Sequence, residues 1–316
     1  MRETLPRQGL ATSHAWDRVT TMAQTALPAP KIKSETDWKN WLGVVPFFLF
    51  ALLFLILPSL KLFVGSFTNN EGNFTFNNIL DLVRQQSILN AYWLSIRISA
   101  VTAIGGGIFG FLLAYAVTVG GLPRFLRIGL ITFAGVASNF AGVPLAFAFV
   151  ATIGRTGFVT VLLKDVFGLN IYQHGFNLYS FWGLSITYMY FQFPLMVLIM
   201  APALDGLKRE WREAAENLGA TTLQYWTRVA LPVLLPSILG AMILLFGNAF
   251  GAYATAYALT GGTLPIVTIQ IGAQIRGDVL HNPGLGYAMA MGMVFIMAVS
   301  LAGYSWLQKL SERWLR

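Results

Sequence analysis

A polar stretch at residues 208–232 separates two long uncharged segments and has the most informative spacing in the chain. A Glu-Ala-Ala run is followed by a glycine after three intervening residues, and by a Leu-Pro pair after a further eleven. The carboxylate can pair with basic groups, the alanines let a second surface approach the backbone, and the glycine can reverse the chain after a helix. This chemistry suits a helix–turn–helix that a partner protein grips. The positions concerned are Glu213, Ala214, Ala215, Gly219, Leu231 and Pro232.

Polar side chains are scarce within the apolar segments, and the few that occur could contact a solute weakly and release it. They could equally form hydrogen bonds between helices, each contributing about 0.6–2 kcal/mol in a membrane. No Asp, Glu, Lys or Arg falls in the central part of a predicted span, which argues against coupling to a proton or sodium gradient. It also leaves a polycation without a counter-charge. The candidate residues for a solute pathway are Asn139, Tyr188, Tyr190, Gln192, Asn248 and Tyr253.

Residues for covalent or metal chemistry are not assembled in this sequence. There are no cysteines, and the three histidines, His14, His174 and His281, have no spacing typical of metal ligands. No Ser/His/Asp constellation can be recognised, and no GxxxxGK[ST] phosphate-binding loop occurs. We therefore predict no catalytic residue, no metal site and no ATP hydrolysis by this chain.

The elements that position these residues are predicted to be membrane-spanning helices. The chain is 56% hydrophobic and 11% charged, whereas soluble domains are about 25% charged. Lipid offers no partner for backbone N–H and C=O groups, and no segment alternates apolar and polar residues as a barrel strand would. An all-α membrane protein follows, with six spans of roughly 20 or more residues. They are predicted at 42–64, 94–119, 128–150, 181–204, 234–259 and 285–307.

The basic residues predict the orientation of these spans. Most of the 21 lysines and arginines fall in the two terminal segments, the loop between the second and third spans, and the loop between the fourth and fifth. Positive charge is retained inside, so both termini and residues 208–232 are expected to be cytoplasmic. The net charge of +8 then reflects topology and contact with lipid headgroups, and no nucleic-acid partner is expected. Residues 1–40 contain no apolar core of a signal peptide and are predicted to be a cytoplasmic tail.

Several local features are also predicted. Pro58 should break the first span, and Asp205 should cap a helix at 208–218. Gly219 should adopt a positive φ, and Thr221 or Thr222 should cap a helix at 223–229. Pro232 should mark where the fifth span begins, and residues 266–271 should form a re-entrant or interfacial segment.

The spacing at 208–232 resembles the EAA loop of ATP-binding-cassette (ABC) importer permeases. The family pattern is EAA, three residues, Gly, nine residues, Ile, one residue and Leu-Pro. All these positions match except Val229, where the family favours Ile. Residues 90–310 resemble the common permease core, and the chain is most similar to the subgroup that includes spermidine and putrescine importers.

This resemblance implies a type I permease fold with six transmembrane helices, a transmembrane domain at 41–316 and a cytoplasmic coupling loop at 205–232. It implies a multi-pass protein of the bacterial inner membrane that passes a small polar solute such as a polyamine. The implied partners are a second permease, identical or related, two cytoplasmic ATPases that hold ATP and Mg, an external solute-binding protein and membrane lipid. Other members of the subgroup move ferric iron, thiamine or aminophosphonates. An ion-coupled carrier and a lipid-modifying membrane enzyme are the competing functions.

Overall fold

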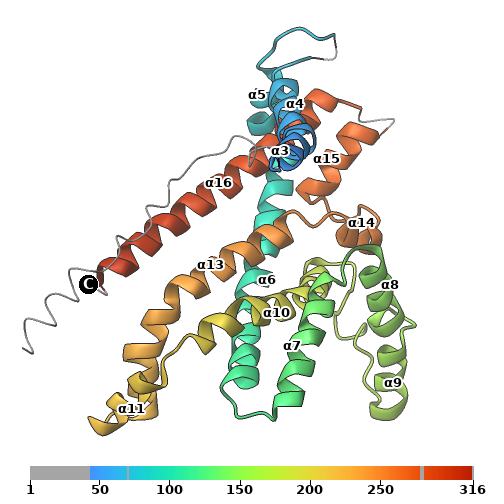
Figure 1. Ribbon diagram of the computed structural model, residues 1–316. Helices are drawn as coiled ribbons and strands as arrows, with labels where there is room; N and C mark the ends of the chain where they lie inside the picture. The colour runs from blue at the N-terminus through green and yellow to red at the C-terminus, as the bar shows by residue number, and fades with distance from the viewer. Residues whose placement is uncertain (1–42, 70, 278–280, 315–316) are drawn as a thin grey trace, which may run out of the picture. The chain divides into compact units, whose positions relative to one another are not determined.

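The computed structural model describes residues 43–69, 71–277 and 281–314 (Figure 1). These residues are helical, with no strand among them beyond an isolated bridge between Thr68 and Phe74. Six of the described helices are long and apolar enough to cross a membrane, in agreement with the predicted class. The chain divides into two compact units, residues 1–57 and 58–316, which are treated separately. The predicted tail at 1–40 lies outside the described residues.

The first unit contains α3 (Val45–Ala51) and the π-helical turn η1 (Leu52–Ile56), which leads into α4 (Leu57–Ser66). The N–H of Leu57 donates to the carbonyl of Leu52, five residues earlier, directly before Pro58. A proline has no N–H to donate and its ring crowds the carbonyl four residues back. The wider turn accommodates it, so the prediction that Pro58 breaks this helix is wrong.

The core of the second unit is a pair of long helices, α6 (Gln86–Thr118) and α10 (Phe181–Asp205). Their close approach depends on glycines of α6. A Cβ atom at Gly106 would lie 2.6 Å from the Cβ of Gln192, and one at Gly110 would lie 2.6 Å from the Cβ of Met196. Small residues permit this close van der Waals packing, which matters in a membrane because lipid is as apolar as the helices and no hydrophobic effect drives them together.

The third predicted span is two separate helices, because the chain leaves helical geometry at Phe140 and Ala141. α7 (Arg124–Asn139) ends there, and α8 (Gly142–Ile153) begins anew with Gly142 at φ +74°. In one continuous helix the ring of Pro144 would crowd the carbonyl of Phe140, whereas in the first turn of a new helix it is tolerated. The span-length segment here is Gly142–Phe167, in which α9 (Phe158–Phe167) follows α8.

The fifth predicted span is also divided differently. α12 (Thr222–Tyr225), the π turn η2 (Trp226–Ala230) and α13 (Leu231–Phe250) form one span-length segment, and α14 (Ala254–Thr260) is separate from it. α13 begins at Leu231 with Pro232 in its first turn, as predicted, and the π turn directly before it joins it to α12. The helix stops at Gly251, before the predicted end of the span.

α5 (Asn77–Arg84) and α15 (Val267–Arg276) lie at the end of this unit opposite α11 (Arg209–Asn217) (Figure 1). Both pack on α16 (Pro283–Trp314), which begins at this end and runs obliquely away from it. The segment predicted to be re-entrant falls largely within α15, whose first N–H, from Val267, donates to Ser95 Oγ at 2.9 Å.

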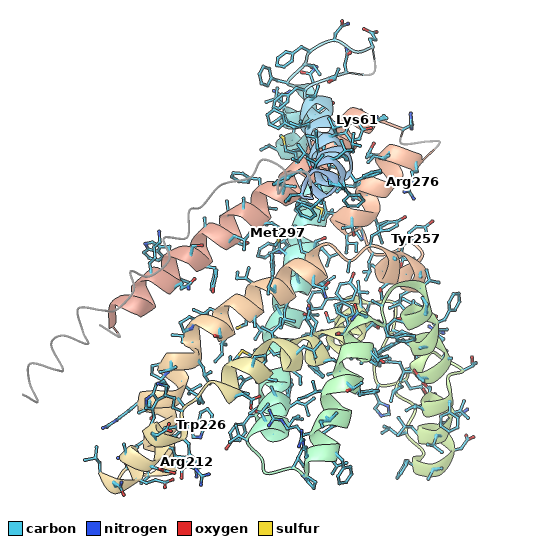
Figure 2. The ribbon with its side chains drawn as sticks, in the orientation of Figure 1. Lys61, Arg212, Trp226, Tyr257, Arg276 and Met297 are labelled. Carbon is cyan, nitrogen blue, oxygen red and sulfur yellow. The ribbon has the colours of Figure 1, made fainter. Side chains whose placement is uncertain are left out.

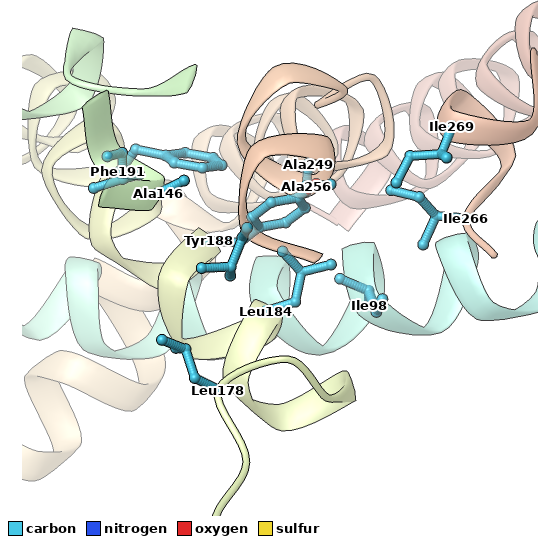
Figure 3. Close-up of a cluster of buried hydrophobic side chains, with 12 residues drawn as sticks. Ile98, Ala146, Leu178, Leu184, Tyr188, Phe191, Ala249, Ala256, Ile266 and Ile269 are labelled. Atoms are coloured by element: carbon cyan, nitrogen blue, oxygen red, sulfur yellow. The ribbon is translucent and has the colours of Figure 1, made fainter. Parts of the chain in front are cut away.

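Buried apolar side chains from α6, α8, α10, α14 and α15 meet in one cluster (Figure 3). Ile98 of α6, Leu184 and Tyr188 of α10 and Ala256 of α14 are among its members, and each is at most 2% exposed. Ala252 and Tyr253, in the interruption at 251–253, pack against this cluster.

Candidate functional site

The helix α11 carries the Glu-Ala-Ala positions and projects from the bundle without a buried residue. It ends in two backbone hydrogen bonds: Gly219 N–H donates to Glu216 O at 2.9 Å, and Ala220 N–H donates to Ala215 O at 3.0 Å. This is a Schellman motif, and it requires the positive φ that Gly219 adopts, +76°. The predicted turn is therefore confirmed in its local geometry.

The next helix begins at the cap that the sequence predicts. Thr221 Oγ1 accepts from Gln224 N–H at 3.3 Å, and Gln224 Oε1 accepts from Thr221 N–H at 2.8 Å, which makes a reciprocal capping box. The cap predicted for Asp205 is wrong. Asp205 is the last residue of α10 and forms an ion pair with Arg127 of α7, while Lys208 occupies the cap position of α11.

Two of the three carboxylates of α11 have partners on the same helix. Arg209 pairs with Glu213 at 3.1 Å and Arg212 with Glu216 at 2.9 Å. The hydrogen bond to Glu216 raises the pKa of Arg212. Because all four side chains are exposed, these pairs contribute little to stability and can be exchanged for charges on a partner.

Two leucines of this loop are unusually exposed. Leu218 is 88% exposed and Leu223 is 73% exposed, on either side of the Gly219 turn. The sequence analysis missed them, because a leucine beside a helix end is ordinarily a core residue. Behind them, Tyr225 is buried and Trp226 contacts Tyr115 of α6 edge-to-face, with the ring centres 5.0 Å apart. The loop is thus anchored on α6 while its apolar tip faces outward.

A second candidate site lies where the two helix interruptions meet. Gly142 N–H, at the start of α8, donates to Thr255 Oγ1 of α14 at 2.7 Å. Tyr188 Oη of α10 donates at 2.8 Å to the carbonyl of Ala252, which the interruption at 251–253 leaves outside any helix. Beside these bonds is a cavity of about 390 Å³, lined by Ser138, Ala141, Gly142, Phe191, Gly247, Asn248, Gly251, Ala252, Tyr253, Ala254 and Thr255.

The six predicted pathway residues have different surroundings. Asn248 and Tyr253 line this cavity, and Tyr188 lies directly behind it. Gln192 is fully buried and donates to Thr102 Oγ1 of α6 at 3.2 Å, which is a hydrogen bond between two helices. Tyr190 packs against phenylalanines of the α7–α8 region, and Asn139 donates to the carbonyl of Gly135 within its own helix.

The cavity includes residues that sequence reasoning did not select, notably Ser138 and Thr255. Neither carries a distinctive spacing, because a hydroxyl group in a helix commonly bonds to its own backbone. The described residues include no group of three or more His, Cys, Asp or Glu side chains suited to a metal ion. What the cavity offers is hydroxyl, amide and backbone polar groups for transient contact with a small solute.

Residues 40–316 match the family described as "Binding-protein-dependent transport system inner membrane component". A probable sulfate transport system permease protein of Helicosporidium sp. subsp. Simulium jonesii is 28% identical over 80% of this chain and 88% of that protein. A putative ferric transport system permease protein of Haemophilus influenzae is 24% identical over 82% of this chain and 40% of that protein. Among solved structures, a bacterial ABC transporter involved in the import of the acidic polysaccharide alginate has a similar fold, with a TM-score of 0.66 at 17% identity, over 95% of this chain and 99% of that chain.

Proposed function

Because the chain belongs to the family of binding-protein-dependent transport system inner membrane components, the permeases of ABC importers, we propose that it forms a solute passage with a second permease and that separate cytoplasmic ATPases drive it. The second permease is identical or related, and an external binding protein delivers the solute. The observation that carries this proposal is the projecting α11 loop, which has the motif residues, exposed charges and exposed leucines that a partner surface needs.

The loop is joined to membrane helices at both ends, so a force applied to it would reach those helices. At one end it continues from α10, and at the other it continues through α12 and η2 into α13. The contact between Trp226 and Tyr115 fastens it to α6 as well. Movement of the ATPases would displace α10 and α13 together, and α13 ends at the interruption that lines the 390 Å³ cavity. We propose that this cavity belongs to the solute pathway and changes its access during the cycle.

The cargo is proposed from the relatives, whose names give sulfate in one case and ferric iron in the other. We propose an inorganic ion of this kind. Ferric iron is among the alternatives expected from the subgroup resemblance, whereas sulfate is not. The polyamine expectation stays a prediction, and these two relatives do not support it.

Copurification with the ATPase tests the proposed coupling. Leu218→Glu and Leu223→Glu place charge at the exposed apolar tip of the loop. We expect each to weaken retention of the ATPase by about tenfold or more, as for a buried hot-spot residue. Leu169→Glu, at a 44% exposed leucine after α9, is the matched control and should retain the ATPase.

The same preparation distinguishes the competing function. An ion-coupled carrier would show uptake driven by a proton or sodium gradient, with no ATPase in the purified complex. That result, or equal ATPase retention by all three leucine variants, would contradict the coupling proposed here.

A further inference from the structure

A second cavity, of about 290 Å³, lies against one face of α15. Tyr253 lines both this cavity and the larger one at the helix interruptions, so its side chain is a wall that the two spaces share. Thr268, Gly272 and Arg276 recur every four residues along α15 and therefore lie on the same side of the helix. The complete lining is Tyr253, Thr268, Ile271, Gly272, Ile275 and Arg276.

The tyrosine wall is held in place by its neighbours. A Cβ atom on Gly272 would lie 3.2 Å from the Tyr253 ring, so the glycine allows the ring to lie close against α15. The opposite support is Tyr257 of α14, whose ring is stacked on Tyr253 with the centres 5.4 Å apart and the planes 18° apart. Figure 2 shows Tyr257 on α14 and Arg276 at the end of the neighbouring α15.

The polar groups of this cavity are hydrogen-bond donors. Thr268 Oγ1 is buried and has no hydrogen-bond partner among the described residues. Arg276 is exposed and carries a permanent positive charge, and the phenol of Tyr253 can also donate. The six lining residues include no acidic side chain. A cation would find no counter-charge among them, whereas a small oxyanion would find a guanidinium group and two hydroxyl groups.

We propose that this cavity recognises a small oxyanion of the sulfate or phosphate class, with Arg276 as the specificity-determining residue and Thr268 and Tyr253 as additional donors. The inference rests on the proposed function and narrows its cargo. A guanidinium group presents a planar fork that matches two oxygens of such an anion. The anion would then pass Tyr253 into the larger cavity, which lacks a fixed charge. A strong contact followed by a weak one lets a solute enter and still leave.

Uptake by the complete transporter tests this proposal. The permease–ATPase complex and its binding protein are reconstituted in proteoliposomes with ATP inside, and uptake of labelled sulfate, phosphate and ferric iron is measured separately. Arg276→Gln should lower the initial rate for the oxyanion by about tenfold to a hundredfold, since it removes a charged hydrogen-bond donor. Thr268→Val should lower it less, and Arg276→Lys should retain more of the rate than Arg276→Gln does.

Arg155→Gln is the matched control, because it removes one exposed positive charge from the turn between α8 and α9, outside both cavities. It should leave uptake unchanged. ATP-driven uptake of iron in place of either oxyanion, or oxyanion uptake that Arg276→Gln does not reduce, overturns the assignment and leaves the permease function standing. If the purified wild-type complex contains no ATPase, the proposed function itself is contradicted.

Discussion

At the scale of single residues, Gly219 shows most directly how the loop acquires its shape. Its φ is +76°, and no heavy atom lies within 4 Å of where a Cβ would stand. A side chain at this position would therefore meet no neighbour, and its cost would come from the backbone conformation alone. For residues other than glycine, the left-handed region costs roughly 1–2 kcal/mol, and β-branched residues tolerate it worst.

We predict that Gly219→Val loses most uptake, while Gly219→Asn keeps more of it because asparagine tolerates a positive φ. The valine variant should still insert in the membrane, since α11 contributes no buried residue. Uptake normalised to the amount of protein in the membrane is the measurement. Gly303→Val is the control, at a helical glycine that also has open space around its Cβ position. Equal uptake by Gly219→Val and this control would refute the requirement for a left-handed turn.

At the scale of elements, two interruptions create the larger cavity. Each leaves polar backbone groups that a continuous helix would have satisfied, and in an apolar environment those groups need partners. Thr255 provides one for the N–H of Gly142, and Tyr188 provides one for the carbonyl of Ala252. These two bonds join α8 to α14 and α10 to the end of α13, so the interruptions are held together as one structure.

We predict that Thr255→Val destabilises the protein by about 1–3 kcal/mol, because it leaves the partly buried Gly142 N–H without its acceptor. Thr255→Ser keeps the hydroxyl group and should cost less. The measurement is thermal unfolding of the detergent-solubilised complex, with uptake assayed in parallel. If the serine variant were the less stable of the two, packing of the threonine methyl group and not the hydrogen bond would be what matters at this contact.

At the scale of the whole molecule, the basic loops gather at one end of the unit formed by residues 58–316. The ion pair between Arg127 and Asp205 brings the start of α7 to the end of α10, next to α11. The charged loops that the sequence assigns to one side of the membrane are therefore neighbours in space. From the distribution of basic residues, we predict that this is the cytoplasmic end.

The absence of cysteines allows this orientation to be tested without background. We predict that Leu218→Cys reacts with a membrane-impermeant maleimide only in inside-out vesicles. Glu71→Cys, in the exposed loop before α5, should react only in intact spheroplasts. Labelling of Leu218→Cys should fall when the ATPase is bound, because the leucine is then covered. Reaction of both variants from the same side would contradict the proposed topology.

Much of the fold could be predicted because it follows from local chemistry. The apolar segments around α6, α10 and α16 are long enough to require helices in lipid, whatever their neighbours. The turn at Gly219 and the cap at Thr221 could also be predicted, since each depends on a residue's own conformational preference and on bonds within a few positions.

The tertiary structure alone decided where the third and fifth spans stop and which residues meet there. Gly142 bonds to Thr255 and Tyr188 to Ala252, and such contacts between distant segments leave no periodic pattern in the sequence. Asp205 shows the same limit. We predicted a helix cap from its local sequence, whereas in the structure it pairs with Arg127 of α7. The sequence determined which segments are apolar enough to need lipid and which loops carry positive charge, because bilayer thickness and charge act on each segment separately. The cavities depend on how helices pair across the chain, and only their packing could place them.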